Sequence, residues 1–597
     1  MFHRIDEDHI YTGKTIPVEL EDIFKVDNHV HVQNTIIPAN MFSNEEDLDY
    51  WLPMFFSTGY YNVITLPKDE ANKMNQLNPY NSLNQRQSNR YGGNTNTQNS
   101  TSGTSDDDLA DYDLVDVFLP MLSRERVEND IYWIDAGRAL FGIYEGDDTG
   151  LYRWIEFTER SDAHTPQECK ELYPSFYDKT LSIKTLAWYA REDSPVEYGN
   201  WHLQWYTPAL EKATSCLHSD VAEALYRVYW LDFACASLTK SSLYFFSNHI
   251  WRQLDNGHTL RTYMSKQFKN IFEKFRTDIS IKIQDSLDKR FKDSAELLVK
   301  KIGSLINKLS TRPFKNNVLA ESLEKFKIED FGQKLNANPN IIGMVNGVIE
   351  AGDKAAYFRN GKPEDFVSKS TGLIWKDLHW KHPLVMKLLN WLKRVYPNKE
   401  LLDYFGKFGG SCIRGRNSDK LLVIMTGGGN NSKSMIKKAF EAAFGAYCIT
   451  IPTSAITQKR STGPDPAIAR SKYAHIAFTQ EPDADAPIKN GTIKEMTGGD
   501  RFFARFLNDN GGEIEPMFKF VLQCNTVPMF TSAEKSIKNR VRLMPHLSTW
   551  ATNAPKNIKE QFEKRTFPLD KFFENQIPEM APALMWYFVQ MLSLIHI

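Results

Sequence analysis

Two kinds of hydrophobic pattern alternate along the chain: stretches in which apolar residues recur with a helical period, and short apolar runs bounded by turn residues. The helical period covers residues 114–204 and most of residues 205–330, so we expect mostly helical domains there. Residues 338–352 (NPNIIGMVNGVIEAG) instead predict two short strands around a turn at Asn346-Gly347. Residues 382–415 return to the helical period and predict two helices.

The C-terminal third contains the clearest strand signals. Leu421 to Met425 are consecutive apolar residues and predict a buried strand. A glycine-rich segment, GGGNN, ends this strand, and MIKKAFEAAFG then has the spacing of a helix. Further apolar runs in YAHIAFTQEPD and KFVLQCNTVPMF predict two more buried strands, and a shorter run lies in SIKNRVRLMP.

The hydrophobic pattern disappears between Asn72 and Asp108, where Asn, Gln, Ser, Thr and Gly replace nearly all aliphatic residues. Such a segment cannot bury enough apolar surface to offset the entropy of ordering it, so we predict a disordered linker over residues 72–113. Residues 1–71 before it have a folded composition. The DNHVH motif there is interpreted as one face of an exposed strand rather than as a set of metal ligands.

An amphipathic helical segment from Arg261 to Lys308 carries many basic residues. Phe268 and Phe272 belong to its apolar stripe, whereas lysines such as Lys274 and Lys300 lie outside the stripe. We interpret the lysines as a solvated helix face. The alternative is a surface that faces DNA, because lysines neutralise phosphates without reading sequence.

Length and composition restrict the class of protein. A chain of 597 residues with 42% hydrophobic and 13% aromatic residues is expected to fold into about three or four globular domains. With a formal net charge of −2, any nucleic-acid contact must use local basic faces. The six cysteines form no CxxC pair, which argues against a zinc site or a disulfide framework and suits a reducing compartment. No apolar run is long enough to span a membrane, and the polar N-terminus does not resemble a signal peptide.

The strand, glycine-rich loop and helix predict a cradle for phosphate groups, because loop amides and a helix N-terminus face the anion. Against the pattern G-x-x-x-x-G-K-[ST], Gly427 is the first glycine, Lys433 the lysine and Ser434 the hydroxyl that reaches Mg²⁺. Ser432 departs from the pattern, since glycine is expected there; serine either strains the loop or fits it if φ is negative. The predicted nucleotide-binding residues are Gly427, Gly428, Gly429, Asn430, Asn431, Ser432, Lys433 and Ser434.

A phosphate cradle of this kind needs an acidic partner that holds Mg²⁺ and polarises water. Glu481 follows the next apolar strand, and a carboxylate at the C-terminal end of a neighbouring parallel strand points at the phosphate crevice; Asp483 is a weaker candidate. Asn525 ends the strand after that, where an amide can sense the γ-phosphate or orient the attacking water. Arg540 and Arg542 come next, and an arginine there can stabilise the transition state of a neighbouring subunit's ATP.

These motifs, in this order, resemble those of superfamily 3 helicases, with GGGNNSKS as Walker A, AFTQEP as a Walker B-like strand, IKEMTGGDRFFAR as the intermediate motif and LQCNTVP as the sensor motif. More closely, the chain resembles the poxvirus-type (D5-like) primase-helicase family of nucleocytoplasmic large DNA viruses. YWIDAGRALFGIY, RWIEFTERS and TLAWYAREDSP resemble the helical C-terminal domain of that family's primase. The resemblance covers roughly residues 115–550. His546 stands where the family usually has an aromatic residue.

The resemblance implies an α/β P-loop ATPase of AAA+ type, in which helices sandwich a parallel sheet, preceded by mostly helical domains. It implies an ATP-dependent DNA helicase of viral genome replication that works as a homo-hexameric ring. ATP and Mg²⁺ are the implied cofactors, single-stranded or forked DNA is the implied partner, and a viral replication site in the host cell is the implied location.

The same resemblance assigns roles to the candidate residues. Lys433 would hold the β- and γ-phosphates, Ser434 and Glu481 the Mg²⁺, and Asn525 would sense the γ-phosphate. Either Arg540 or Arg542 would act across the subunit interface. The candidates for tracking DNA in the ring channel are Lys494, Arg501 and Arg505, which surround a predicted tight turn at Gly498-Gly499.

The expected domain order also follows from the resemblance. An N-terminal region that could be a remnant of a primase part (1–71) and the linker (72–113) come first, then a primase C-terminal-like helical domain (114–204), a helical D5-like N-terminal domain (205–382), the superfamily 3 helicase AAA+ domain (383–550) and the start of a C-terminal helical region (551–597). The paired acidic residues of a primase core are not found. The last residues, LSLIHI (592–597), resemble a translated sequencing-library adapter, so we expect the natural chain to continue past Met591.

Two other functions stay open at the level of the sequence. Ser432 and the lone Glu481 are compatible with an ATP-binding, DNA-binding or scaffolding ring that has weak or no unwinding activity. An unrelated P-loop kinase fits less well, because the motif order differs and no acceptor site is visible. DNA-stimulated ATP turnover separates the helicase from both.

Overall fold

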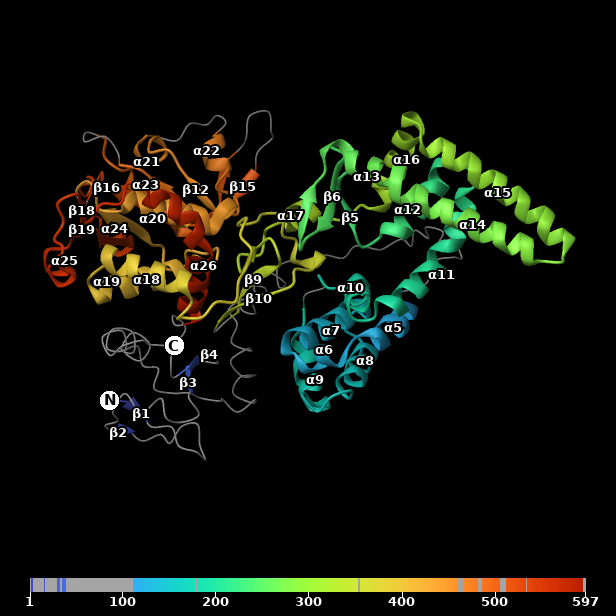
Figure 1. Cartoon of the computed structure of the whole chain (residues 1–597), viewed down its shortest axis with the longest axis horizontal. Coiled ribbons are helices and arrows are strands. Elements are labelled where there is room, and N and C mark those ends of the chain that lie inside the picture. Colours follow the sequence, from blue (N-terminus) through green and yellow to red (C-terminus); the bar gives the residue numbers. More distant parts are fainter. Residues whose placement is uncertain are drawn as a thin grey trace, which may run out of the picture.

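The computed structural model describes residues 111–593, apart from residues 178–179, 353–354, 459–464, 482–485, 505–511 and 533, together with short strands near the N-terminus (Figure 1). These strands are β1 (Phe2–His3), β2 (Thr15–Ile16), β3 (His29–Val32) and β4 (Thr35–Pro38), paired β1-β2 and β3-β4. The strand expected at the DNHVH motif is therefore present as β3. The predicted linker up to residue 110, Arg505, Asp483 and residues 594–597 of LSLIHI lie outside the described residues.

The first helical unit contains α5 (Asp111–Phe118), α6 (Arg124–Glu128), α7 (Asp130–Ile143), α8 (Asp148–Thr158), α9 (Pro166–Leu172) and α10 (Ile183–Asp193). Helix α5 begins at Asp111, inside the segment predicted as a linker (residues 72–113). Acidic side chains in its first turn favour a helix N-terminus, and Leu114 and Val115 are buried in the core. Trp133 and Trp154 are buried in the core, as expected for a helical domain. Gly137 allows α7 and α8 to approach, since a Cβ there would lie 2.4 Å from the Trp154 ring.

The next region is helical with an inserted sheet. Its helices are α11 (Pro195–Ala213), α12 (His218–Tyr229), α13 (His258–Tyr263), α14 (Lys269–Asp285), α15 (Lys289–Leu309), α16 (Arg312–Lys325) and α17 (Phe331–Lys334). The mostly helical region expected here also contains an antiparallel sheet that the sequence analysis did not predict, formed by β5 (Phe233–Ser237), β6 (Ser242–Ser247) and β7 (Ile250–Gln253). A turn at Asn248 and His249, both with positive φ, folds SLYFFS back onto IWRQ as a hairpin, and this turn chemistry overrides the helical period.

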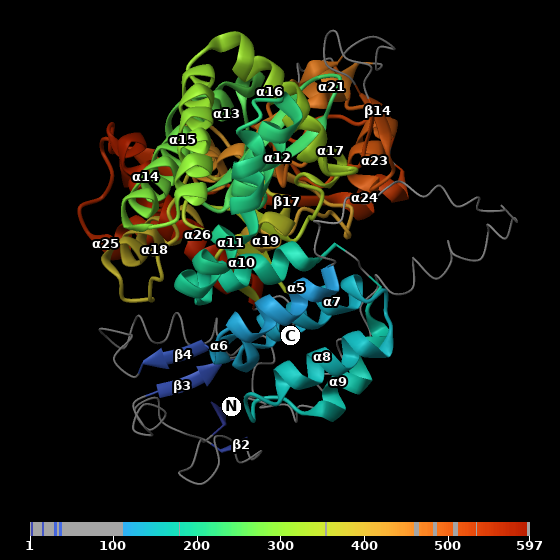
Figure 2. The same ribbon diagram turned by 90° about the vertical axis from the view of Figure 1, so that its right-hand side faces the viewer.

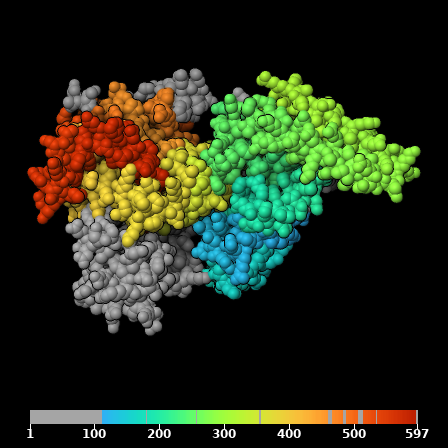
Figure 3. Space-filling model, in the orientation of Figure 1, coloured from blue at the N-terminus to red at the C-terminus, as the bar shows by residue number. Residues whose placement is uncertain are grey.

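Helices α14 and α15 project from the body of the molecule as a helical hairpin (Figures 1 and 3). Phe268 and Phe272 are buried, which confirms the apolar stripe predicted for this segment. Lys274 and Lys300 are exposed, as the solvated-face interpretation requires.

A three-stranded antiparallel sheet of β8 (Ile341–Gly343), β9 (Val348–Ala351) and β10 (Ala356–Arg359) follows. The β8–β9 hairpin confirms the two strands predicted around Asn346-Gly347. Helices α18 (Pro383–Val395) and α19 (Lys399–Ser411) confirm the two helices predicted before the phosphate cradle. None of the helices that the structure describes is long and apolar enough to cross a membrane.

The C-terminal region is built on a five-stranded sheet in which all strands are parallel. The spatial order is β12 (Cys448–Thr450), β13 (Ile476–Thr479), β16 (Lys519–Cys524), β11 (Leu422–Thr426) and β17 (Val541–Pro545). Smaller elements around it are α21 (Ser454–Thr457), α22 (Pro466–Ala469), α23 (Asn490–Gly498), α24 (Lys535–Arg540), α25 (Ile558–Lys564), β14 (Phe502–Ala504), β15 (Gly512–Ile514), β18 (Thr549–Ala551) and β19 (Thr566–Pro568).

Side chains that alternate along β11 enter two different hydrophobic cores, one on each face of the sheet. Val423 and Met425 pack with α19, α20 (Lys433–Phe444) and α26 (Ile577–Ser593). Leu422 and Ile424 pack with residues of α22, α23 and α24 on the other face. Helices thus cover both faces of the sheet (Figures 1 and 2). A mainly helical region followed by an α/β region with a parallel sheet agrees with the predicted fold class.

Candidate functional site

The predicted site residues lie where neighbouring parallel strands end. Strands β13, β16 and β11 are adjacent, and the carboxyl ends of parallel strands meet at one edge of a sheet. Glu481 follows β13, Asn525 follows β16 directly, and the glycine-rich loop joins β11 to α20. Residues far apart in the sequence are therefore collected at this edge.

The glycines of the loop have different structural roles. Gly427 has φ +145, and a Cβ there would lie 2.4 Å from Asn431 Nδ2 and 2.5 Å from the His546 carbonyl oxygen. Only glycine fits this conformation and this space. Gly428 and Gly429 are exposed, and a Cβ at either would meet nothing within 4 Å. At these two positions the loop backbone lies open to a ligand.

Ser432 has φ 64 and ψ 7, which is the left-handed helical region. The torsion is positive, so the alternative in which serine fits the loop with a negative φ is wrong. A non-glycine residue in this region costs roughly 1 kcal/mol or more. Ser432 is also the N-cap of α20, yet its side chain accepts no capping hydrogen bond. The loop thus carries strain that glycine would relieve.

The Lys433 amine lies between the loop and the end of β16. It donates a hydrogen bond to the Gly427 carbonyl oxygen and another, of 3.1 Å, to Asn525 Oδ1. Loss of water around the amine lowers the pKa of Lys433, and the negative charge of Glu481 partly opposes this shift. The amine thus links the glycine-rich loop to the end of β16.

Glu481 joins the same group of contacts. Its Oε1 atom lies 3.5 Å from the backbone nitrogen of Thr526, which donates to it, and the Gly427 nitrogen lies 3.3 Å from the Asn525 carbonyl oxygen. Lys433, Asn525 and Glu481 are thus within one connected cluster. Ser434 is exposed in the first turn of α20.

The two candidate arginines do not join this cluster. Arg540 donates to Thr497 Oγ1 at 3.2 Å and to the Ser536 carbonyl oxygen at 2.8 Å. Arg542 is exposed on β17, opposite Val423 in the sheet register, which is upstream of the loop at the end of β11. The hydrogen bonds of both arginines thus go to residues outside the glycine-rich loop.

The predicted DNA-tracking residues are only partly described. Lys494 forms an ion pair with Glu534, whose pKa this contact and nearby hydrogen bonds lower to about 2. Arg501 is exposed and lies 3.8 Å from the carboxylates of Glu513 and Glu515. Both cations thus have acidic neighbours in the same chain.

The sequence did not point to two residues, His546 and Tyr396, whose hydrogen bonds hold the glycine-rich loop in place. His546 Nδ1 lies 3.1 Å from the Asn431 carbonyl oxygen, and the Tyr396 hydroxyl lies 3.1 Å from His546 Nε2. A carbonyl only accepts, so Nδ1 carries the hydrogen and Nε2 accepts from Tyr396. Burial lowers the pKa of His546 to about 4, which keeps the imidazole neutral. The only sequence signal was the departure at His546 from the family's aromatic residue, and nothing pointed to Tyr396.

Comparisons with known proteins bear on the class of this chain. Residues 222–396 match the family model described as D5 N terminal like, and residues 116–190 match Primase C terminal 2 (PriCT-2). The chain is 26% identical over 510 residues to the "Putative helicase L207/L206" of Acanthamoeba polyphaga mimivirus, covering 82% of this chain and 52% of that protein. It is 24% identical over 565 residues to the "Putative helicase 022R" of Frog virus 3, covering 79% of this chain and 57% of that protein.

Other relatives agree with these two. The "Putative primase C962R" of African swine fever virus is 23% identical over 261 residues, which covers 43% of this chain and 27% of that protein. The chain spans about half the length of the first two relatives. A solved structure, the apo form of the NrS-1 C-terminal region, covers 42% of this chain and 68% of that chain at 9% identity, with a TM-score of 0.27, which is too low to carry an argument.

The chain therefore combines a D5 N-terminal-like segment and a PriCT-2 segment with a parallel α/β region. Its relatives are proteins of large DNA viruses that are named putative helicases and primases. The resemblance to the D5-like primase-helicases of nucleocytoplasmic large DNA viruses is confirmed.

Proposed function

We propose that this chain is the ATP-hydrolysing part of a DNA helicase of superfamily 3, with a P-loop domain of AAA+ type. One observation carries the proposal: Lys433, Asn525 and Glu481, which follow three adjacent parallel strands, lie in one cluster beside an open glycine loop. The helicase names of the relatives support the same class of activity.

The chemistry of ATP hydrolysis assigns a task to each group. Lys433 and the open backbone of Gly428 and Gly429 bind the β- and γ-phosphates. Asn525, which already contacts the lysine, detects the γ-phosphate. Glu481 orients and activates the attacking water.

Mg²⁺ is the expected metal at this site. Hydroxyl and carboxylate oxygens suit Mg²⁺, which binds few protein ligands and keeps waters and phosphate oxygens as the others. Ser434 and Glu481 supply such oxygens, and both are exposed at the strand edge. Among the residues that the structure describes, no three His, Cys, Asp or Glu side chains form a metal site. The bound ion would neutralise charge on the phosphate oxygens.

The proposal includes a homo-hexameric ring on single-stranded or forked DNA at a viral replication site. Arg540 and Arg542 lie away from the loop of their own chain, so they can serve only the loop of another subunit. Lys494, Arg501 and Arg505 remain the proposed DNA contacts. The first two would have to exchange their acidic neighbours for phosphates.

Strand separation tests this function. A forked duplex with one labelled strand, mixed with the protein and ATP, should yield the free strand, and the Lys433→Ala variant should yield none. The variant should still fold and bind the fork, because Lys433 is the first residue of α20 and belongs to neither hydrophobic core.

A second function has a specific observation in its favour. Ser432 strains the loop, which weakens binding of a nucleotide and is compatible with an ATP-binding scaffolding ring that has weak or no unwinding activity. Hydrolysis and DNA binding without strand separation, over a range of protein concentrations, would favour the scaffold over the helicase.

A further inference from the structure

Helix α15 carries a row of exposed side chains along one side. Arg290, Leu297 and Lys301 follow one another after seven and four residues, a spacing that puts all three on the same face of a helix. All three are exposed to solvent, and the leucine is 55% exposed although it is apolar. The row therefore presents two positive charges with an apolar side chain between them.

Helix α8 carries a row of the opposite charge. Asp148, Tyr152 and Glu159, the last of which is the C-cap residue of the helix, follow one another after four and seven residues. All three are exposed, and Tyr152 is 67% exposed. The core of the first helical unit lies against the other side of α8, where Trp154 and Phe157 are buried. This row therefore presents two negative charges with an aromatic side chain between them.

The two rows match when the helices run antiparallel. The spacing of seven and then four residues on α15 is repeated in reverse order on α8, so each member of one row lies opposite a member of the other. The facing pairs are then Arg290–Glu159, Leu297–Tyr152 and Lys301–Asp148. The charges and the apolar centre are thus in register over about 16 Å of each helix.

The charges of both rows are available for such a contact. Among the residues that the structure describes, the charged members of the two rows form no ion pair. The surrounding regions have opposite net charges, because residues 111–193 carry 18 acidic and 9 basic side chains, whereas residues 269–309 carry 6 acidic and 10 basic ones. Helices α8 and α15 lie well apart in both views of the chain (Figures 1 and 2), so one chain cannot form this pair by itself.

A second copy of the chain fits the row on α15 better than DNA does. The DNA backbone is uniformly negative, whereas the α14–α15 hairpin mixes acidic with basic side chains. The exposed Leu297 finds an apolar surface on Tyr152 of a second copy, and a phosphate backbone offers it none.

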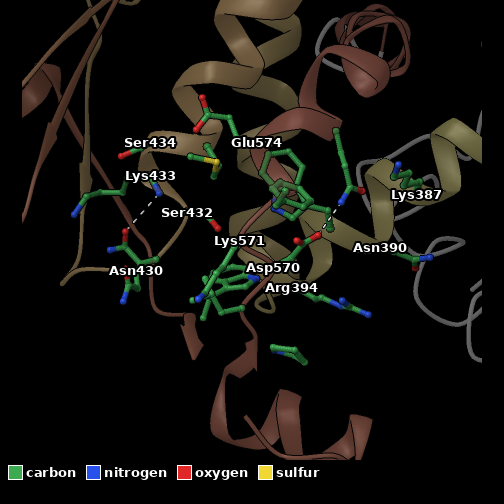
Figure 4. Close-up of a pocket in the computed structure, with 18 residues that line it drawn as sticks. Lys387, Asn390, Arg394, Asn430, Ser432, Lys433, Ser434, Asp570, Lys571 and Glu574 are labelled. Atoms are coloured by element: carbon green, nitrogen blue, oxygen red, sulfur yellow. Dashed lines mark hydrogen bonds between the residues drawn. The ribbon is translucent and has the colours of Figure 1, made fainter. Parts of the chain in front are cut away.

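We propose that α15 of one copy of this chain packs antiparallel on α8 of a second copy. Packed helices lie about 8–10 Å apart, which lets the oppositely charged side chains pair and covers Leu297 and Tyr152. The contact joins two different patches of the same chain, and contacts of this kind build rings or filaments. It does not involve the start of α20, where Ser432, Lys433 and Ser434 lie (Figure 4). The inference therefore goes beyond the proposed hydrolysis of ATP and does not rest on it.

Cross-linking of two cysteine variants tests the contact without nucleotide. Leu297→Cys protein, mixed with Tyr152→Cys protein and a short bis-maleimide, should give a product that joins the two introduced cysteines, identified by the masses of its peptides. Ser304→Cys is the matched control, because residue 304 is also exposed on α15 and lies about 10 Å further along the helix. With Tyr152→Cys it should give several-fold less product.

Reversal of charges in register gives a second test. Arg290→Glu, introduced into both cysteine variants, should lower the initial rate of cross-linking roughly 2- to 30-fold, because an exposed ion pair becomes a repulsion. Adding Glu159→Arg should restore the rate. Adding Asp148→Arg instead gives the same net charge but faces Lys301, so it should not restore the rate.

The charge reversals at the first facing pair suit the helices in which they lie. Arg290→Glu places an acidic side chain near the N-terminus of α15, and Glu159→Arg places a basic one at the C-terminus of α8. Both changes are favourable to the helix dipole. A lower rate of cross-linking in Arg290→Glu therefore reports the contact and not a loss of helix.

Absence of the product that joins Leu297→Cys to Tyr152→Cys, or an equal amount from Ser304→Cys, would overturn the contact. Equal rescue by Glu159→Arg and Asp148→Arg would show an attraction without register and would overturn it as well. If Arg290→Glu weakens binding of forked DNA and leaves cross-linking unchanged, the row belongs to a DNA site instead. None of these results depends on turnover, so failure of this contact and failure of the proposed function are distinguishable.

Discussion

Ser432 has an unfavourable backbone conformation in the glycine-rich loop. Its backbone adopts φ 64, a conformation that costs little for glycine and roughly 1 kcal/mol or more for serine. Asn430 in the same loop also has positive φ, but asparagine tolerates this conformation better than most residues. The loop therefore carries a strain at Ser432 that glycine would not carry.

We expect Ser432→Gly to tighten nucleotide binding about fivefold, because glycine removes the strain of roughly 1 kcal/mol. Calorimetric titration with ADP measures the change. Ser432→Ala is the matched control, since it removes the hydroxyl and keeps the Cβ that causes the strain. An equal gain of affinity in both variants would mean that the hydroxyl, and not the torsion, weakens binding.

Glu481→Gln should leave ATP binding nearly unchanged and lower turnover by about 10²–10⁴-fold. The amide keeps the shape of the side chain and loses the charge that activates water, and general base catalysis contributes about this factor. ATP binding by equilibrium dialysis and phosphate release by a coupled assay give the two values. Turnover at the wild-type rate would assign the base to another acid near the strand edge.

The sequence predicted the site residues to different degrees. The glycine and lysine spacing predicted the loop between β11 and α20, and the strand ends predicted that Glu481 and Asn525 lie near it, because both signals are local. The torsion of Ser432 and the contacts of His546 with Asn431 and Tyr396 depend on tertiary packing, which no local pattern records. The orientation of Arg540 toward Thr497 was hidden for the same reason.

At the scale of elements, the phosphate loop is supported by two segments that are distant in sequence. The residue after β17, His546, bonds to the loop carbonyl of Asn431 and to Tyr396, which ends α18. Trp550 on β18 bonds to the neighbouring carbonyl of Asn430. The loop between β11 and α20 is thus fixed on the side opposite its open glycines.

The contacts of His546 should make the stability of the region around the five-stranded sheet depend on pH. The pKa of His546 is about 4 in the folded chain and near 6.5 when unfolded, so the unfolded chain binds the proton first as pH falls. The stability is complete above about pH 6.5 and is lost progressively toward pH 4, by on the order of 2–3 kcal/mol. The thermal midpoint should therefore fall between pH 7 and pH 5.

His546→Gln should show a smaller fall of the thermal midpoint over this interval, measured by calorimetry at both pH values. His475→Gln is the matched control. His475 is also buried, its pKa is lowered in the same direction, to about 3, and it lies away from the loop against the Cys412 and Ile413 carbonyls. Both variants should flatten the pH dependence, but only His546→Gln should also weaken ADP binding. An unchanged pH dependence in His546→Gln would show that this histidine is not buried in its neutral form.

Elements were predicted well where the hydrophobic period was long or the turn chemistry explicit. Helices α18 and α19 and the β8–β9 hairpin are examples. The β5–β7 sheet was missed because its strands are short, lie among long helices, and turn at Asn248 and His249 without a glycine.

At the scale of the whole molecule, buried contacts join the first helical unit to the segment that follows the three-stranded sheet β8–β10. Lys362, after β10, forms an ion pair with Asp135 on α7, and Thr185 on α10 donates a 2.9 Å hydrogen bond to Glu364. The five-stranded sheet and α20 lie at the opposite end of the molecule from α14 and α15 (Figure 1). If subunits assemble through the five-stranded sheet and its helices, as we propose, the α14–α15 hairpin would lie away from those contacts.

Mixing two inactive variants tests assembly. Arg542 is exposed on the edge strand β17, so in a ring at least part of the hydrolysis should depend on the arginine of a neighbour. Removal of such an arginine lowers the rate about 10³–10⁵-fold in phosphoryl transfer. Lys433→Ala and Arg542→Ala proteins should each be inactive and regain activity together, because the first lends its arginine to the intact loop of the second.

The control for this mixture is either variant alone at the same total concentration, which should stay inactive. Arg542→Ala protein that hydrolyses ATP at the wild-type rate would remove Arg542 from the mechanism, and the same experiment with Arg540→Ala would then decide for the other arginine.

The decisive measurement for the proposed site is ATP hydrolysis with and without single-stranded DNA, in the wild type and in Lys433→Ala. DNA should stimulate turnover in the wild type, and Lys433→Ala should lose turnover with an unchanged circular dichroism spectrum. Equal turnover in the two proteins, with or without DNA, would contradict the claim that the strand ends around Lys433 form the site of hydrolysis.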